Sequence, residues 1–208
     1  MMVSTGTVFV VDDDPAIRES LRFLLESVAL PVETYESAEE FLDKFNTSWG
    51  GCLVLDVKMP GMSGLALQRE LAVRGVSIPI VFITAHGDIP LAVRACKAGA
   101  LHFIEKPFSD AQLLALVREG LARDQAAAAE KTELALFVGR LSSLTARETE
   151  IMDLVVAGKS NKETATELGV SPRTVEVHRA RLMTKLGMDS VATLVRLRLR
   201  AIAASLPT

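Results

Sequence analysis

Polar residues that can bind a metal ion and a phosphoryl group stand at the ends of short apolar runs in the first half of the sequence. They are Asp12, Asp13, Asp56, Thr84 and Lys106. Carboxylates without a neighbouring thiolate or imidazole form a hard oxygen site suited to Mg²⁺, with Mn²⁺ as an alternative ion. A hydroxyl and an ammonium are groups that bind phosphoryl oxygens. Asp is also common in solvated turns, but five such groups at consecutive strand ends favour one shared site.

The apolar runs that precede these residues have the composition of buried strands. They are rich in β-branched residues and alternate with segments in which apolar residues recur at helical spacing. The predicted strands cover residues 8–11, 31–35, 52–57, 78–84 and 101–105. The pattern predicts an α/β domain of the flavodoxin-like, doubly wound (βα)5 type, with a parallel sheet covered on both faces. Such folds bind ligands at the carboxyl ends of their strands.

Asp14 is predicted to have a different role from the two aspartates before it. It precedes Pro15 and a segment with helical spacing. An Asp followed by Pro is typical of a helix start, where the carboxylate accepts a hydrogen bond from the first turn. We therefore expect Asp14 to cap a helix and not to bind the metal.

The second half of the sequence predicts helices only. Thr145 with Glu148, and Ser160 with Glu163, have the spacing of capping boxes, and Ser171 precedes a proline. Glycines at 158, 169 and 187 stand where helices should end. The predicted helices lie near 145–157, 161–168, 172–186 and 190–204. A tight turn joins the second to the third, which predicts a separate all-α domain with a helix-turn-helix.

The last of these segments allows two interpretations. As a helix, it places Val191, Leu194, Val195 and Ile202 on one stripe, but Arg198 falls within that stripe. Its Arg-Leu-Arg-Leu-Arg centre alternates in the way that a strand does.

Charge divides the chain into the same two parts as the predicted secondary structure does. Residues 140–208 contain 11 Lys and Arg against 7 Asp and Glu, a balance of +4, whereas residues 1–139 contain 12 against 19, a balance of −7. The basic part is the candidate for binding a polyanion. We predict domains at 1–124 and 141–208, joined by an alanine-rich linker at 125–140. Alanine favours a linker that continues the preceding helix, and a flexible tether is the alternative.

No apolar run approaches the length of a membrane span, and the N-terminus lacks a basic region followed by a hydrophobic stretch. The expectation is a cytoplasmic protein without a membrane partner. Cys52 and Cys96 both lie in apolar segments, so both are predicted to be buried thiols in a reducing compartment.

Residues 5–125 resemble the receiver domain of two-component response regulators. The similarity rests on four motifs in order: VVDD at 10–13, LDVKMPGMSG at 55–64, TA at 84–85 and FIEKPF at 103–108. The resemblance implies that a histidine kinase or a small phosphodonor phosphorylates Asp56, and that the Lys106–Pro107 peptide is cis.

The resemblance also implies roles for the other residues of the site. Asp13, Asp56 and the backbone carbonyl of Lys58 would bind Mg²⁺, and Asp12 would act directly or through water. Thr84 and Lys106 would bind the phosphoryl oxygens, and Phe103, in place of the commoner tyrosine, would be the rotating switch residue. His86, two residues after Thr84, is a candidate for setting how long the phosphate survives.

Residues 144–199 resemble the C-terminal DNA-binding domain of the LuxR type, and the whole chain resembles transcriptional regulators of the FixJ/NarL class, with motifs that lean towards FixJ. In the third helix of this part, Val175, Leu182 and Leu186 share one face, which predicts contact with the core. The predicted DNA-binding residues are Lys162, Arg173, Thr174, Val177, His178, Arg179, Arg181 and Lys185.

These resemblances imply a switch. Phosphorylation would release the second domain or pair two receivers as a homodimer, which would bind double-stranded DNA with two-fold related half-sites. A histidine kinase and RNA polymerase are the other expected partners. An enzyme with an aspartate nucleophile is the alternative, but Lys58 occupies the position at which such phosphohydrolases carry a second carboxylate. A constitutive DNA-binding module is a third reading.

Overall fold

The structure is a computed structural model that describes residues 6–46, 49–85 and 89–205. Contacts within the chain divide it into two compact units, Met1–Ala128 and Ala129–Thr208. Each unit has a hydrophobic core of its own and is described separately.

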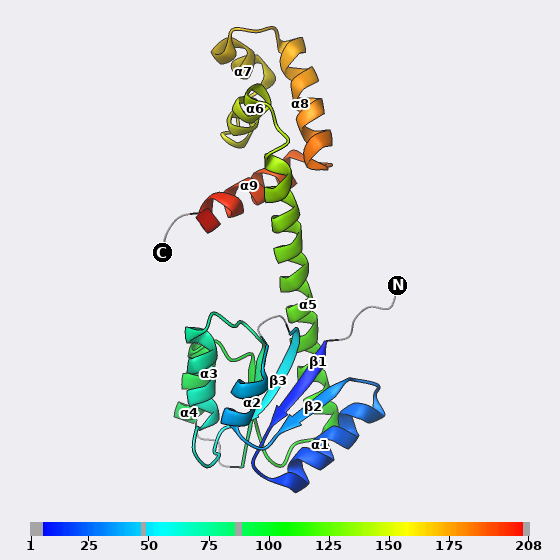
Figure 1. The fold of residues 1–208 in the computed structure, drawn as a ribbon, viewed down its shortest axis with the longest axis vertical. Helices are drawn as coiled ribbons and strands as arrows, with labels where there is room; N and C mark the ends of the chain where they lie inside the picture. The colour runs from blue at the N-terminus through cyan, green and yellow to red at the C-terminus, as the bar shows by residue number, and fades with distance from the viewer. Residues whose placement is uncertain (1–5, 47–48, 86–88, 206–208) are drawn as a thin grey trace. The chain divides into compact units, whose positions relative to one another are not determined.

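The first unit contains a five-stranded parallel sheet (Figure 1). Its strands are β1 (Thr7–Val11), β2 (Val32–Tyr35), β3 (Gly51–Asp56), β4 (Ile80–Thr84) and β5 (His102–Glu105). The strand order is β2-β1-β3-β4-β5, so the order reverses between β1 and β3. Val10 pairs with Thr34 on one side and with Val54 on the other. This is the doubly wound fold that the sequence predicted.

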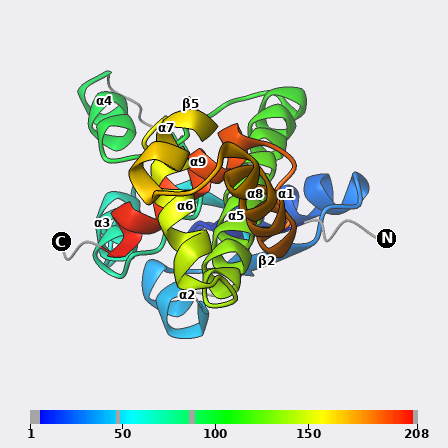
Figure 2. The same ribbon diagram turned by 90° about the horizontal axis from the view of Figure 1, so that it is seen from above.

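Helices cover both faces of this sheet. They are α1 (Pro15–Ser27), α2 (Ala38–Lys44), α3 (Gly64–Val73), α4 (Ile89–Lys97) and α5 (Asp110–Leu141). Helices α1 and α5 pack on one face through a core that includes Leu25, Val117 and Val54. Helices α2, α3 and α4 pack on the other face, and Figures 1 and 2 show α1 on the opposite side of the sheet from α3 and α4. Both faces of the sheet are therefore buried, as parallel sheets require.

Local signals at the helix starts position the strand ends. The Asp14 carboxylate accepts a hydrogen bond from the Ala16 amide, 2.8 Å away, and caps α1 as predicted. Ser63 caps α3 in the same way. The next residue, Gly64, leaves no room for a side chain, because a Cβ there would collide with the backbone oxygen of Asp56. The backbone of α3 can therefore approach the end of β3 closely.

The second unit is helical. Besides the last part of α5, it contains α6 (Ala146–Val156), α7 (Asn161–Leu168), α8 (Pro172–Leu186) and α9 (Val191–Ser205). Both predicted capping boxes are present, and Gly169 and Gly187 adopt left-handed conformations where α7 and α8 end. The core contains Val175, Leu182 and Leu186 of α8, as the helical spacing predicted. Phe137 of α5 is 1% exposed and belongs to the same core.

The last helix differs in part from its prediction. Residues 191–205 are helical, so the strand interpretation is wrong. Leu194 is buried and Val191 packs against the core, as predicted, but Leu197 is also buried and Ile202 is exposed. Arg196 binds Glu133 of α5, and Arg198 binds Asp153 of α6.

The two thiols have different environments. Cys52 is buried in β3, but Cys96 is exposed on α4, so the prediction of two buried thiols is wrong for Cys96. Cys96 lies on the solvent side of an amphipathic helix, a position that its apolar neighbours in the sequence do not reveal. Among the described residues, no helix is long and apolar enough to cross a membrane.

Candidate functional site

The carboxyl edge of the sheet brings together the polar residues that the sequence singled out. Asp12 follows β1, Asp56 ends β3 and Thr84 ends β4, and these three strands are neighbours. Lys106 follows β5. All four residues come from one edge because the strands are parallel.

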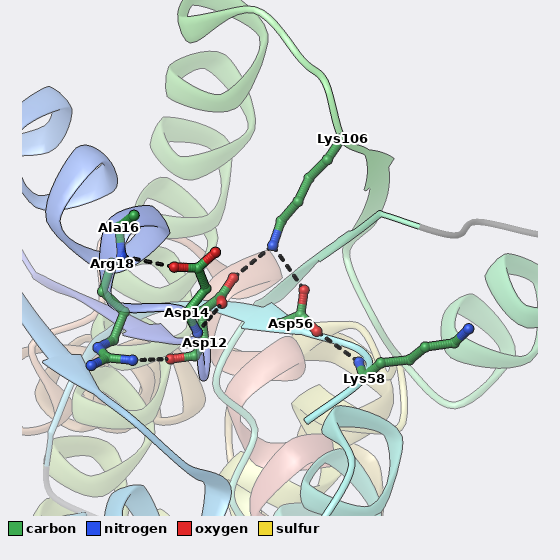
Figure 3. Close-up of polar contacts among 7 residues, drawn as sticks. All are labelled: Asp12, Asp14, Ala16, Arg18, Asp56, Lys58 and Lys106. Atoms are coloured by element: carbon green, nitrogen blue, oxygen red, sulfur yellow. Dashed lines mark hydrogen bonds and ion pairs between the residues drawn. The ribbon is translucent and has the colours of Figure 1, made fainter. Parts of the chain in front are cut away.

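The ammonium group of Lys106 links two of the carboxylates (Figure 3). Its Nζ lies 2.7 Å from Oδ2 of Asp12 and 2.9 Å from Oδ1 of Asp56. The Asp12 side chain is 1% exposed and that of Lys106 is 18% exposed. Two buried carboxylates that share one cation retain an excess of negative charge, which a second cation would neutralise.

Backbone groups fix the other carboxylate oxygens (Figure 3). The Lys58 amide donates to Oδ2 of Asp56 at 2.7 Å, and the Asp14 amide donates to Oδ1 of Asp12 at 3.0 Å. The guanidinium of Arg18 donates to the backbone oxygen of Asp12 at 2.7 Å. Sequence patterns did not identify Arg18. Its place one helical turn after the Asp14 cap, facing the end of β1, is the signal that could have found it.

Burial and charge pairing shift two pKa values in this site. Burial raises the pKa of Asp12 above its ordinary value, although the hydrogen bonds from Lys106 and the Asp14 amide oppose this. Burial also acts to lower the pKa of Lys106, but the hydrogen bonds to Asp12 and Asp56 outweigh it, and the pKa is raised. The lysine is therefore a cation at neutral pH, as binding to phosphoryl oxygens requires.

The other predicted residues of this site have different surroundings. Asp13 is exposed, and no group of three acidic, histidine or cysteine side chains close enough to hold a metal is found in the described part of the chain. Thr84 is buried at the end of β4. Phe103 is partly buried, with its ring 6.3 Å from that of Phe82. The Lys106–Pro107 peptide is cis, whereas His86 lies outside the described residues.

A second candidate site lies on α7 and α8, which are joined by the turn at 169–171. Val177 and Arg181, one turn apart on α8, are exposed, as are Arg173 and, at the start of α7, Lys162. Thr174 and His178 are half-buried. The exposed side of α8 thus offers two apolar residues, Val177 and Ala180, between cations, a composition suited to base edges and phosphates.

Some of the predicted DNA-binding residues have partners within the unit. Arg179 donates to Oδ1 of Asn161 at 2.8 Å, which ties α8 to α7. Lys185 donates to Oε2 of the buried Glu148 at 2.7 Å. Arg173 pairs with Glu176 on the surface. The spacing of cations along one helix shows which of them share a face, but it does not show which carboxylates on other helices bind them.

Comparisons with known protein families cover both units. The family described as "Response regulator receiver domain" matches residues 8–118, and "Bacterial regulatory proteins, luxR family" matches residues 142–198. The receiver match contains the whole acidic site, and the second match contains α6, α7 and α8.

Known relatives match nearly the whole chain. The transcriptional regulatory protein FixJ of Bradyrhizobium diazoefficiens is 42% identical over 96% of this chain and 98% of its own length. FixJ of Azorhizobium caulinodans is 47% identical over 93% of this chain and 92% of its own length.

Solved structures of response regulators also match nearly the whole chain. The response regulator StyR is 46% identical and superposes with a TM-score of 0.75, covering 95% of this chain and 100% of its own. Full-length FixJ from B. japonicum is 41% identical, with a TM-score of 0.58, and covers 97% of this chain and 99% of its own. This chain therefore belongs to the two-component response regulators that join a receiver domain to a LuxR-type DNA-binding domain and regulate transcription.

Proposed function

We propose that Asp56 is the phosphoacceptor of this response regulator. The observation that carries the proposal is the pair of carboxylates, Asp12 and Asp56, that share the ammonium of Lys106. A carboxylate oxygen of Asp56 attacks the phosphorus of a histidine kinase phosphohistidine or of a small phosphodonor. The bond from phosphorus to the leaving group breaks, and an acyl phosphate forms.

The donor set fits a hard divalent cation such as Mg²⁺, because it consists of carboxylate and carbonyl oxygens. Asp12, Asp56 and the Lys58 carbonyl would hold the ion, together with Asp13, which is exposed in this structure and would turn towards them. The ion would neutralise charge on the phosphoryl group and its nucleophile. Lys106 moves its hydrogen bonds from the carboxylates to the phosphoryl oxygens, and Thr84 donates to another of them. Water attack on the acyl phosphate would then break its bond to Asp56, release inorganic phosphate and restore the free carboxylate.

We also propose that phosphorylation controls DNA binding through dimerisation. Thr84 draws towards the phosphoryl group and Phe103 follows, which changes the surface of α4, β5 and α5. A receiver homodimer brings two basic domains together, so the second half-site is bound intramolecularly. The DNA-facing residues in this proposal are Lys162, Arg173, Thr174, Val177, His178 and Arg181. RNA polymerase is the further partner of the bound dimer.

The intact mass of the protein with acetyl phosphate, with and without Mg²⁺, tests the first proposal. Wild type should gain one phosphoryl group only with Mg²⁺, and Asp56→Asn should gain none. Gel filtration of the same samples should show a dimer for phosphorylated wild type alone. Equal gain by the Asn variant would overturn the assignment of Asp56, and phosphorylation without a dimer would overturn the proposed control.

A further inference from the structure

The loop that follows Asp56 is held by a carboxylate from another element. Oε1 of Glu39, in the first turn of α2, accepts a hydrogen bond from the Met62 amide at 2.8 Å. Gly61 has a φ of +72°, and a Cβ at this position would lie 2.8 Å from the same oxygen. The carboxylate therefore lies directly over the Gly61–Met62 backbone, and Gly61 provides both the turn and the space that this contact needs.

The same loop carries the backbone of the proposed metal site. At its start, the Lys58 amide donates to Asp56, and the Gly64 amide donates to the Val57 carbonyl at 3.1 Å. At its end, Ser63 caps α3. Glu39 contacts the loop between these two anchored ends, so that it limits the movement of the segment that presents the Lys58 carbonyl.

Glu39 has no part in capping its own helix. Ser37 is the N-cap of α2 and accepts from the Glu40 amide. Oε2 of Glu40 accepts from the Glu36 amide at 2.8 Å, so Glu40 completes the first turn. The Glu39 carboxylate reaches away from α2 to a residue 23 positions further along the chain.

We propose that Glu39 is a positioning residue for cation binding at the acidic site. It holds the loop so that the Lys58 carbonyl is oriented before Mg²⁺ arrives, and it touches neither the ion nor the reacting atoms. The inference rests on the proposed function of Asp56 and Lys58. Groups that orient metal ligands in this way typically change metal affinity by about 10–100-fold when they are removed.

Three variants separate the hydrogen bond from the charge. Glu39→Ala removes both, and Glu39→Gln removes the charge but retains an oxygen acceptor for the Met62 amide. Glu36→Ala is the matched control, because it removes a negative charge from an exposed residue that stands just before α2. Thermal unfolding followed by the fluorescence of Trp49, the only tryptophan, verifies that each variant has a folded first unit.

Titration of full-length protein with Mg²⁺ alone, followed through backbone amide NMR signals of residues 57–59 and 61–64, measures the affinity without phosphorylation. We expect Glu39→Ala to weaken Mg²⁺ binding about tenfold. The Met62 amide should also exchange its proton faster in this variant before Mg²⁺ is added. Glu39→Gln should restore most of the affinity, and Glu36→Ala should equal wild type.

Two results would overturn the inference. One is equal Mg²⁺ affinity of wild type and Glu39→Ala, and the other is equal weakening by Glu36→Ala, which would point to net charge alone. Failure of the proposed function has a different signature, since wild type saturated with Mg²⁺ would then gain no phosphoryl group from acetyl phosphate. The Mg²⁺ titration measures affinity without any phosphodonor, so its outcome does not depend on whether Asp56 is phosphorylated.

Discussion

The buried carboxylate of Glu148, in α6, is expected to stabilise the folded DNA-binding unit. Its Oε2 accepts hydrogen bonds from the Thr145 amide at 2.8 Å and from Lys185 of α8 at 2.7 Å. The Glu148 side chain is 4% exposed and that of Lys185 is 37% exposed. One carboxylate oxygen thus caps α6 and ties it to the helix that carries the predicted DNA contacts.

The magnitude follows from the pKa of Glu148. The hydrogen bond from Lys185, followed by that from the Thr145 amide, lowers this pKa from its ordinary 4.5 to about 2. A difference of this size corresponds to about 3 kcal/mol of unfolding free energy at neutral pH. Because solvent reaches Lys185 and weakens the pair, we expect Glu148→Gln to lose about 2 kcal/mol. Glu148→Ala should lose about 1 kcal/mol more, since it also removes the capping acceptor.

The sign of the pH dependence is fixed by the direction of the pKa shift. A carboxyl with a lowered pKa stabilises the folded state above its unfolded pKa, and that stabilisation falls as the pH drops towards the folded pKa. The difference between wild type and Glu148→Gln should therefore be constant from pH 6 to 8. It should shrink as the pH falls from about 4.5 towards 2.

The two units can be followed separately in the full-length protein. Trp49 and Tyr35, the only tryptophan and tyrosine, both lie in the first unit, so intrinsic fluorescence reports on that unit. Urea unfolding measured by hydrogen exchange of peptides from α6 and α8 reports on the second. Glu150→Gln is the control, because Glu150 is an exposed residue of the same helix whose pair with Arg147 should contribute less than 1 kcal/mol. Equal stability of wild type and Glu148→Gln at pH 7, or a difference that is as large at pH 2 as at pH 7, would refute the reasoning.

Three further predictions concern single residues. Arg181→Ala should weaken DNA binding several-fold without changing stability, and it should lower the slope of log affinity against log salt concentration by about 1. Lys185→Ala should mainly destabilise the second unit. Binding and unfolding assays on both variants test this, and a stable Lys185→Ala with the larger loss of binding would contradict it. Phe137→Ala should destabilise the second unit by about 3–5 kcal/mol, since the ring is buried; a loss below 1 kcal/mol in urea unfolding would exclude Phe137 from the core. Cys96 should react rapidly with a thiol reagent at pH 8, whereas Cys52, whose pKa burial raises to about 12, should react only on unfolding; equal rates would contradict this difference.

Features that depend on nearby residues could be predicted from the sequence. The Asp14 cap, both capping boxes and the helix ends at Gly169 and Gly187 each follow from a few adjacent residues, and the structure contains all of them. The meeting of Asp12, Asp56 and Lys106 was also predictable, because parallel strands place their carboxyl ends at one edge.

Features that depend on contacts between distant residues could not be predicted. Helical spacing placed Ile202 on the buried side of α9, where it is exposed, and it did not show the carboxylates of other helices that bind Arg196 and Arg198. The pairing of Lys185 with Glu148 and the contact of Glu39 with Met62 are of the same kind. A sequence pattern specifies the faces of one helix, but the partner of a charged side chain is known only once the helices are packed.

The strand order also has a consequence for synthesis of the chain. Asp12 is translated 94 residues before Lys106, its partner in the folded protein. At about 5–20 residues per second, the ribosome takes roughly 5–20 s to supply this cation. The face of the sheet that α1 shares with α5 stays partly uncovered until Leu113, Val117 and Leu121 have emerged. Once Asp56 has been made, and until Lys106 and α5 follow, the nascent chain exposes an apolar surface beside two carboxylates without their cation, a state that favours late, cooperative closure of the first unit over stepwise folding.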